Sequence, residues 1–221
     1  SVDDAVTMMK PNYNNYCFSK NKLADCMFNS DMVLYCMKSL ILHGVKPDNV
    51  VDPNIRTDFN KLAYLVRLDH GLGENFSVIK EIAEQGEIVT EIATHFSALE
   101  MTDVDNFKSL LFYFGLLSIK GVDMMGRPIL HIPNLVVREQ LFNFLIQGYA
   151  RHDIFKLNVN RLSTLFENMS FKGDWKPLFE FLADAIREQS RIREYIEGEA
   201  HIKGFLLAYL SMFRYYQLYP E

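Results

Sequence analysis

Hydrophobic side chains recur at helical spacing through most of the chain, which predicts a mainly α-helical protein. Many of these stretches are bracketed by capping residues, with serine, threonine, aspartate or asparagine before the first apolar position and often glycine after the last. On this basis we expect helices over residues 30–44, 57–71, 77–86, 103–114, 134–145, 174–186 and 199–216.

The middle of the chain departs from this pattern, because short apolar runs there alternate with turns. Glu87–Val89 is typical of a short strand, and a helix-like stretch follows it to about Ser97. Thr102 and Asp105 have the spacing of a capping box ahead of the helix that ends at Gly115. Two apolar runs then flank a tip rich in turn residues and predict a β-hairpin, with strands near 116–119 and 129–132 and the tip at 121–126.

This order of helix, short strand, two helices and hairpin is that of a winged helix-turn-helix. We therefore expect three parts: helices over 1–75, a winged-helix-like module over 76–150, and connecting helices over 151–221, with net charges of −1, −4 and zero. The last helix is apolar on more than one face, so it needs further partners. That need predicts self-association through the C-terminal helix.

Composition narrows the class of protein. Hydrophobic residues make up 49% of the chain, as in an ordinary globular core. Three cysteines, 17, 26 and 36, fit neither a disulfide framework nor a zinc site and indicate reduced thiols in the cytoplasm. The sequence shows neither a signal peptide nor a run of the roughly 18 apolar residues that a membrane span needs. The chain starts without Met and its last helix runs almost to the end, so we expect a fragment of a longer protein.

Sequence motifs for catalysis are missing from the chain. It contains no GxxxxGK[ST], HExxH, CxxC or GxSxG, and its six histidines are scattered, so we expect no enzyme, no metal site and no cofactor on this chain. Glu199 is the weak candidate for a catalytic carboxylate, since metal-dependent nucleases gather acidic groups around divalent ions. A solvated glutamate at a helix end explains it more simply.

Nucleic-acid binding is the open alternative that the winged-helix order raises. The candidate contacts are Lys108 on the third helix of the module and Lys120 and Arg127 on the hairpin. The formal charge of −5 and the acidic Asp103 and Asp105 argue against a groove-reading helix. Met124-Met125 at the hairpin tip is either a contact for a protein partner or an ordinary exposed turn.

Several motifs together resemble the bacterial AAA-ATPase-like family whose longer members carry a C-terminal PD-(D/E)XK nuclease-superfamily domain. The resemblance spans nearly the whole chain and depends on the combination of motifs. Asn15 stands where the YNGYxFS pattern has glycine, and asparagine also tolerates positive φ. The residues that carry the resemblance are Tyr13–Ser19, Phe28–Tyr35, Asp52–Asp58, Leu110–Leu117, Ile132–Glu139 and Gly198–Leu210.

The resemblance implies that residues 1–75 are the helical lid of an ATPase-like domain and that 199–221 start a nuclease-like domain. ATP and magnesium would then be bound only elsewhere in the parent. Glu199 would be the residue that could join the nuclease site, and Arg56 is a weak candidate near the nucleotide, although pairing with Asp52 or Asp58 explains Arg56 more simply. The expected function is a non-catalytic module that couples the two domains; a nuclease assembled by oligomerisation is the least favoured alternative.

Overall fold

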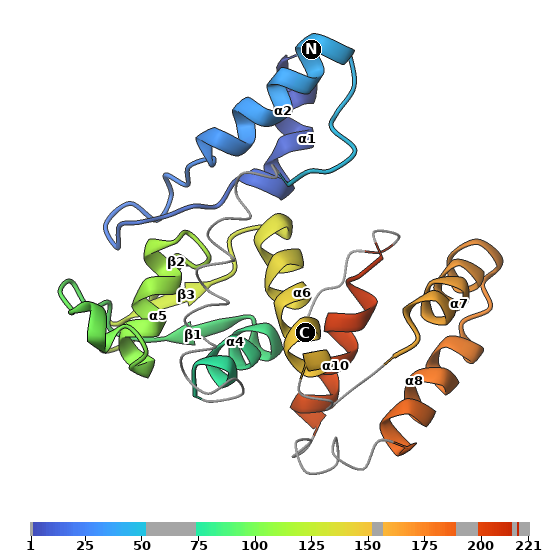
Figure 1. Cartoon of the computed structure of the whole chain (residues 1–221). Coiled ribbons are helices and arrows are strands. Elements are labelled where there is room, and N and C mark those ends of the chain that lie inside the picture. The colour runs from blue at the N-terminus through green and yellow to red at the C-terminus, as the bar shows by residue number, and fades with distance from the viewer. Residues whose placement is uncertain (1, 52–73, 152–156, 189–198, 214–215, 217–221) are drawn as a thin grey trace. The chain divides into compact units, whose positions relative to one another are not determined.

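The computed structural model describes residues 2–51, 74–151, 157–188, 199–213 and 216, which are mainly helical with one small sheet (Figure 1). The mainly α fold class is therefore confirmed. The chain divides into two compact units, residues 1–82 with 86–141 and residues 83–85 with 142–221. The helix expected over 57–71 lies outside the described residues.

Two N-terminal helices of the first unit, α1 (Val2–Tyr13) and α2 (Ser30–His43), pack on each other. Asn29, and not Ser30 as predicted, caps α2, because its side-chain oxygen accepts a hydrogen bond from the Met32 N–H at 3.1 Å. Gly44 ends the helix at φ 71°, as expected. The shared core contains Met9, Tyr13, Met32, Cys36, Val51 and Val136.

The sheet has three antiparallel strands in the order β1-β3-β2: β1 (Glu87–Val89), β3 (Pro128–His131) and β2 (Ser118–Val122). The predicted hairpin is confirmed. Ile88, Leu130 and Ile119 lie side by side across the three strands and are buried, so this face of the sheet belongs to the core. A bulge between Ile119 and Gly121 makes Lys120 the extra residue of β2.

Helices α4 (Glu74–Gln85) and α5 (Val104–Tyr113) come before and after β1 in the chain. The prediction that Ser77 opens the first of them is wrong by three residues. The capping box predicted at Thr102 and Asp105 is also wrong. Ser97 and Glu100 form the capping box instead, at the start of the 3-10 turn η2 (Ala98–Glu100).

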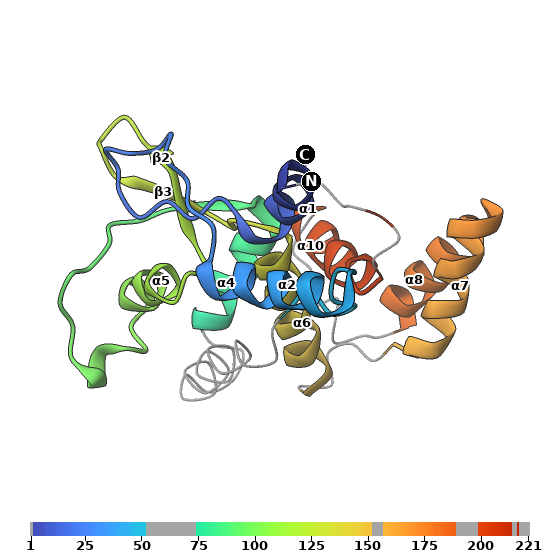
Figure 2. The ribbon, with the colours of Figure 1, turned by 90° about the horizontal axis from the view of Figure 1, so that it is seen from above.

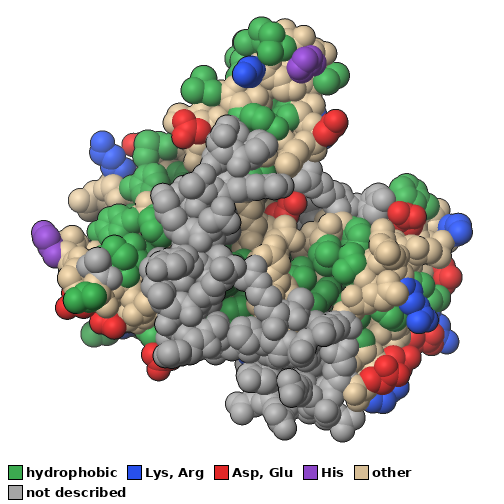
Figure 3. Space-filling view, viewed as in Figure 1, with side chains coloured by type: hydrophobic (Ala, Val, Ile, Leu, Met, Phe, Trp, Pro, Cys, Tyr) green, Lys and Arg blue, Asp and Glu red, His purple; other side chains and the backbone are tan. Residues whose placement is uncertain are grey.

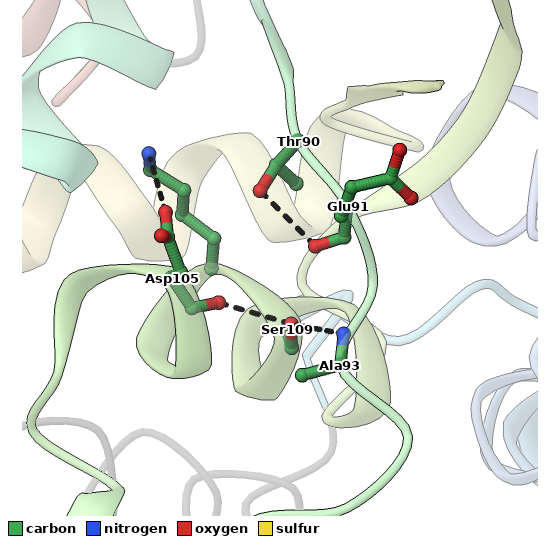
Figure 4. A network of polar contacts seen from close by, with 6 residues as sticks. Thr90, Glu91, Ala93, Asp105 and Ser109 are labelled. Atoms are coloured by element: carbon green, nitrogen blue, oxygen red, sulfur yellow. Dashed lines mark hydrogen bonds and ion pairs between the residues drawn. The ribbon is translucent and has the colours of Figure 1, made fainter. Parts of the chain in front are cut away.

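The helix expected up to Ser97 does not form. Instead, Ala93 donates its N–H to Ser109 Oγ at 2.9 Å, and Ser109 in turn donates to the Asp105 carbonyl at 3.0 Å (Figure 4). Tyr113 donates its hydroxyl to the Ala93 carbonyl at 3.0 Å. These bonds to α5 hold the segment after β1 in an extended course, so tertiary contacts override its local helix propensity.

Helices α6 (Leu135–Arg151), α7 (Val159–Lys172), α8 (Lys176–Glu188) and α10 (Glu199–Leu210) make up the rest of the described chain. α6 crosses the boundary between the units at residue 142, and the others belong to the second unit. In that unit α7 and α8 form a helical hairpin with buried Leu162, Phe166, Leu178, Leu182 and Ala185.

The last helix was predicted to reach residue 216 but ends at Leu210. The chain turns there, and the Met212 N–H donates to the Tyr209 carbonyl at 3.3 Å. Its need for partners is met partly within the second unit, where Ala208 and Tyr209 are buried. Beyond the turn, the Phe213 ring lies 4.8 Å from the Phe166 ring of α7. Part of the described apolar stripe is therefore packed within the second unit.

Candidate interaction surface

Residues Asn14–Cys17 run along the outer edge of β2 and form what we call the N-terminal seam, together with Ser118 and Asn134. Ile119 donates its N–H to the Cys17 carbonyl at 3.0 Å. The Ser118 hydroxyl is fully buried, accepts from Cys17 N–H at 2.7 Å and donates to the Asn15 carbonyl at 2.7 Å. One serine therefore satisfies a buried N–H and a partly buried carbonyl from a segment more than a hundred residues away.

Asn134 joins the seam from the start of α6. Its side-chain amide donates to the Asn14 carbonyl at 3.0 Å, and its side-chain oxygen accepts from the Val137 N–H at 3.1 Å, which confirms it as the helix cap. Asn15 has φ 73°, so the left-handed conformation expected at this position is confirmed. The motifs at 13–19, 28–35, 110–117 and 132–139 all contribute to this one region.

Tyr16 is buried at the centre of the seam. Its backbone pairs with Met27, and its ring lies 3.4 Å from the position that a Cβ on Gly115 would take. Burial raises the pKa of its hydroxyl, and the nearby Asn134 and Asn29 side chains partly oppose that effect. The Ser118 and Asn134 side chains bind backbone groups, whereas Asn14 Oδ1 is buried without a hydrogen-bond partner. Among the residues described, the seam offers no exposed reactive group.

The three candidate nucleic-acid contacts are all paired with carboxylates. Lys108 Nζ lies 3.4 Å from Asp105 Oδ1, and the Arg127 guanidinium lies 2.7 Å from Asp123 Oδ2. Lys120 pairs with Glu87, which lies on the other side of β3. Exposed pairs of this kind contribute little stability, but they lower the positive charge that a phosphate backbone would meet.

His131 lies on β3 opposite Glu87 on β1. Burial, followed by the positive charge of Lys120, lowers the pKa of this imidazole, and Glu87 raises it by a smaller amount. The imidazole is therefore mostly neutral at pH 7 and adds no cation to the Lys120–Glu87 pair.

Helix α5 has little free surface for reading a groove. Phe107, Leu110, Leu111 and Phe112 are buried among apolar neighbours, and Ser109 is held against the extended segment at Ala93. Within Val104–Tyr113, the exposed side chains are those of Asp105 and Tyr113. Neither type presents a positive charge to DNA.

The β2–β3 hairpin ends in a turn that we call the hairpin tip, residues 123–127. Asp123 Oδ1 accepts hydrogen bonds from the N–H groups of Met125 at 2.9 Å and Arg127 at 2.8 Å, and Gly126 takes φ 79°. Desolvation raises the pKa of Asp123, but bonds from Arg127 and Met125 and the charge of Arg127 outweigh it and lower the pKa below its usual value. Met124 and Met125 project into solvent from this turn.

Lys20 is a contributor to this surface that sequence reasoning missed. It lies in the loop 17–27, which runs beside the hairpin (Figure 2), and its ammonium donates to the Gly126 carbonyl at 2.9 Å. Because that acceptor is neutral, the positive charge of Lys20 is not cancelled by this contact. No local sequence signal connects the two positions, since they are 106 residues apart.

Aromatic side chains continue the apolar surface from the hairpin toward α5. The Phe18 ring lies 5.6 Å from Phe112, which lies 5.5 Å from Tyr113, and the outer two of these rings are about half exposed. Figure 3 shows hydrophobic side chains gathered on this face, over β2 and α5. Together with the hairpin tip, these rings form an exposed apolar surface, the kind of feature that contacts between proteins use.

The structure gives no side-chain contacts for the two remaining candidate residues, Glu199 and Arg56. Glu199 is the first residue of α10, with a side chain that is not described, and Arg56 lies outside the described residues. In the part of the chain that the structure describes, no three His, Cys, Asp or Glu side chains are placed to hold a metal ion together.

Comparisons with protein-family models, curated proteins and solved structures find no match for this chain. Among the described helices, none combines the length and the apolar character needed to cross a bilayer.

Proposed function

We propose that this chain is a non-catalytic interaction module, which in a longer protein couples an NTPase-like domain to a PD-(D/E)XK nuclease-like domain. The single observation that carries the interaction role is the hairpin tip, where two exposed methionines occupy a turn whose backbone is ordered by Asp123. Flexible, polarisable methionine side chains adapt to apolar partner surfaces. The family context comes from the sequence resemblance.

The winged-helix interpretation is also part of this proposal. The order α4, β1, η2, α5, β2, β3 and the sheet order β1-β3-β2 support it. The second helix of such a module would be reduced here to the single turn of η2 (Ala98–Glu100). In the proposed module the hairpin is the wing, and the wing rather than α5 makes the contact.

The nucleic-acid alternative has weaker support. Lys108, Lys120 and Arg127 are each paired with a carboxylate, and α5 exposes Asp105 and Tyr113. Titration of labelled duplex and single-stranded DNA at low and moderate salt decides between the two. We expect no salt-sensitive binding below roughly 10 µM; tighter binding that weakens in Lys20→Ala or Arg127→Ala would favour the alternative.

The contact itself is tested by site-specific photocrosslinking in the longer protein. A photoreactive group in place of Met124 should crosslink to a flanking domain or partner, because an adaptable apolar side chain is expected to be buried in that contact. The same group in place of Lys176, an exposed residue at the start of α8, is the matched control. Equal yields at the two positions would contradict the role of the hairpin tip.

The parent's chemistry is proposed to lie outside this chain, with ATP and magnesium bound by the parent and Glu199 at most adjoining the nuclease site. We expect no plasmid nicking by the isolated chain with magnesium or manganese. Cleavage that is lost in Glu199→Gln would instead favour a nuclease assembled by oligomerisation. A rise in melting temperature with ATP would contradict the absence of a nucleotide site.

A further inference from the structure

The hairpin tip satisfies its own polar groups without using the methionine side chains. Asp123 accepts from two backbone N–H groups and pairs with the Arg127 guanidinium, while Gly126 donates its N–H to the Asp123 carbonyl at 3.0 Å. Asp123 N–H in turn donates to the Arg127 carbonyl at 2.9 Å. The thioethers of Met124 and Met125 therefore contribute nothing to the hydrogen bonding that shapes the turn.

The methionines of this chain span a wide range of exposure. Met124 is fully exposed, at 105% of its reference area, and Met125 is 80% exposed. Met27 is 52% exposed, and Met9 and Met32 are 5% and 2% exposed in the core between α1 and α2. An oxidant in solution thus reaches the sulfurs of the hairpin tip most freely.

We propose that Met124 and Met125 are the preferred peroxide-oxidation site of this protein and that their oxidation changes the chemistry of the tip without unfolding it. In each step, hydrogen peroxide transfers one oxygen atom to a thioether sulfur. The sulfur loses two electrons and becomes a sulfoxide, the O–O bond breaks, and the peroxide is reduced to water. Methionine sulfoxide is polar, so each oxidised side chain changes from an apolar group to one that accepts hydrogen bonds.

The regulatory consequence rests on the proposed function. If the hairpin tip contacts a partner through its apolar side chains, a pair of sulfoxides weakens that contact, since the two polar groups would have to be desolvated. The oxidation chemistry does not depend on any partner, so the two ideas can fail separately.

The test is a time course of the isolated chain with dilute hydrogen peroxide, quenched and mapped by peptide mass spectrometry. Trypsin cleaves after Lys120 and Arg138 but not at the Arg127–Pro128 bond, so it releases residues 121–138 as one peptide with both methionines, and fragmentation distinguishes them. We expect oxidation at Met124 and Met125 to be roughly tenfold faster than at Met9 and Met32, with Met27 between them. The same reaction in concentrated urea should erase the ranking, since unfolding equalises access.

A second measurement separates selective modification from damage. After both tip methionines are oxidised, the melting temperature should stay within about 2 °C of the untreated chain, because no core contact is lost. A Met124→Leu/Met125→Leu variant should keep this temperature and lose the fast phase of oxidation. Oxidation of Met9 or Met32 at the rate of Met124, or unfolding that accompanies oxidation of the tip, would overturn the proposal.

Discussion

The N-terminal seam and the hairpin tip lie at different places on the same strand pair and use their residues in opposite ways. In the seam, the buried side chains of Ser118 and Asn134 form hydrogen bonds with the backbone of Asn14–Cys17. In the hairpin tip, the polar groups close a local turn and the apolar side chains remain outside. The first arrangement holds the unit together, and the second leaves a surface available for contact.

The contrast shows that a distinctive motif need not mark a functional surface. Four of the six segments that carry the family resemblance contribute to the seam, where Tyr16, Ser118 and Asn134 are buried. The exposed chemistry lies at Met124-Met125, which resembles an ordinary turn in sequence. Substitutions in the seam should therefore change stability, and substitutions of the two tip methionines should change contacts alone.

The largest effect is expected for Ser118→Ala. Loss of the hydroxyl leaves the buried Cys17 N–H and the partly buried Asn15 carbonyl without this partner, at a cost of about 3 kcal/mol in the free energy of unfolding. Urea unfolding followed by circular dichroism measures it, because the single tryptophan, Trp175, lies in the second unit and does not report on the seam. Ser163→Ala on α7 is the control and should change stability by no more than about 0.5 kcal/mol.

Asn134→Ala should follow, with a loss of about 2 kcal/mol, because it removes the cap of α6 and the donor to the Asn14 carbonyl. Asn134→Ser keeps a capping oxygen and removes the amide donor, so it should recover part of the loss. If the serine variant were no more stable than the alanine variant, capping would not contribute as argued.

Asn15→Ala should cost about 1 kcal/mol, since alanine is strained at φ 73°. Asn15→Gly is the matched comparison and should be nearly neutral, as glycine adopts this conformation freely. Thermal unfolding of the three proteins side by side gives the order; an alanine variant as stable as the glycine one would show that the turn can relax.

Acid should loosen the hairpin tip through Asp123. Because the folded state lowers the pKa of this carboxyl, ionised Asp123 stabilises the turn above its unfolded pKa of about 4. The contribution is lost as pH falls through the lower folded pKa. Amide hydrogen exchange at Met125 and Arg127 between pH 6 and pH 3, corrected for intrinsic rates, should show the loss, and Asp123→Asn should abolish this pH dependence.

The smallest effect on stability is expected for the Met124→Ala/Met125→Ala double variant. Its free energy of unfolding should lie within about 0.5 kcal/mol of that of the unmodified chain, because both side chains are exposed. The same urea unfolding measurement provides the comparison with Ser118→Ala. A loss of 2 kcal/mol or more would show that the tip stabilises the fold, and it would remove the argument that these side chains are free for a partner.

Much of the local structure could be predicted from the sequence. Helical spacing of apolar residues located most of the described helices, alternating apolar runs located the hairpin, and Asn134 was recognisable as a cap. The errors included local starts and stops, at Ser30, Ser77 and the last helix, the capping box at Thr102, and a predicted helix before Ser97 that does not form. In that last case Ser109 and Tyr113 bind the backbone at Ala93, and no pattern within 90–97 could reveal them. The ranges of α1 and α7 were not predicted.

Only the local features of the candidate interaction surface could be predicted from the sequence. The sequence by itself determined that a turn with two methionines joins the hairpin strands, although the predicted tip began two residues early, at Gly121, which lies in β2. It also determined that position 15 needs a residue tolerant of positive φ, because such preferences depend on a residue and its near neighbours. Tertiary structure alone decided that Ser118 meets Asn15, that Lys20 reaches Gly126, and that Lys120 is paired with Glu87. Those contacts join residues that are distant in the chain, and only the folded backbone sets their distances.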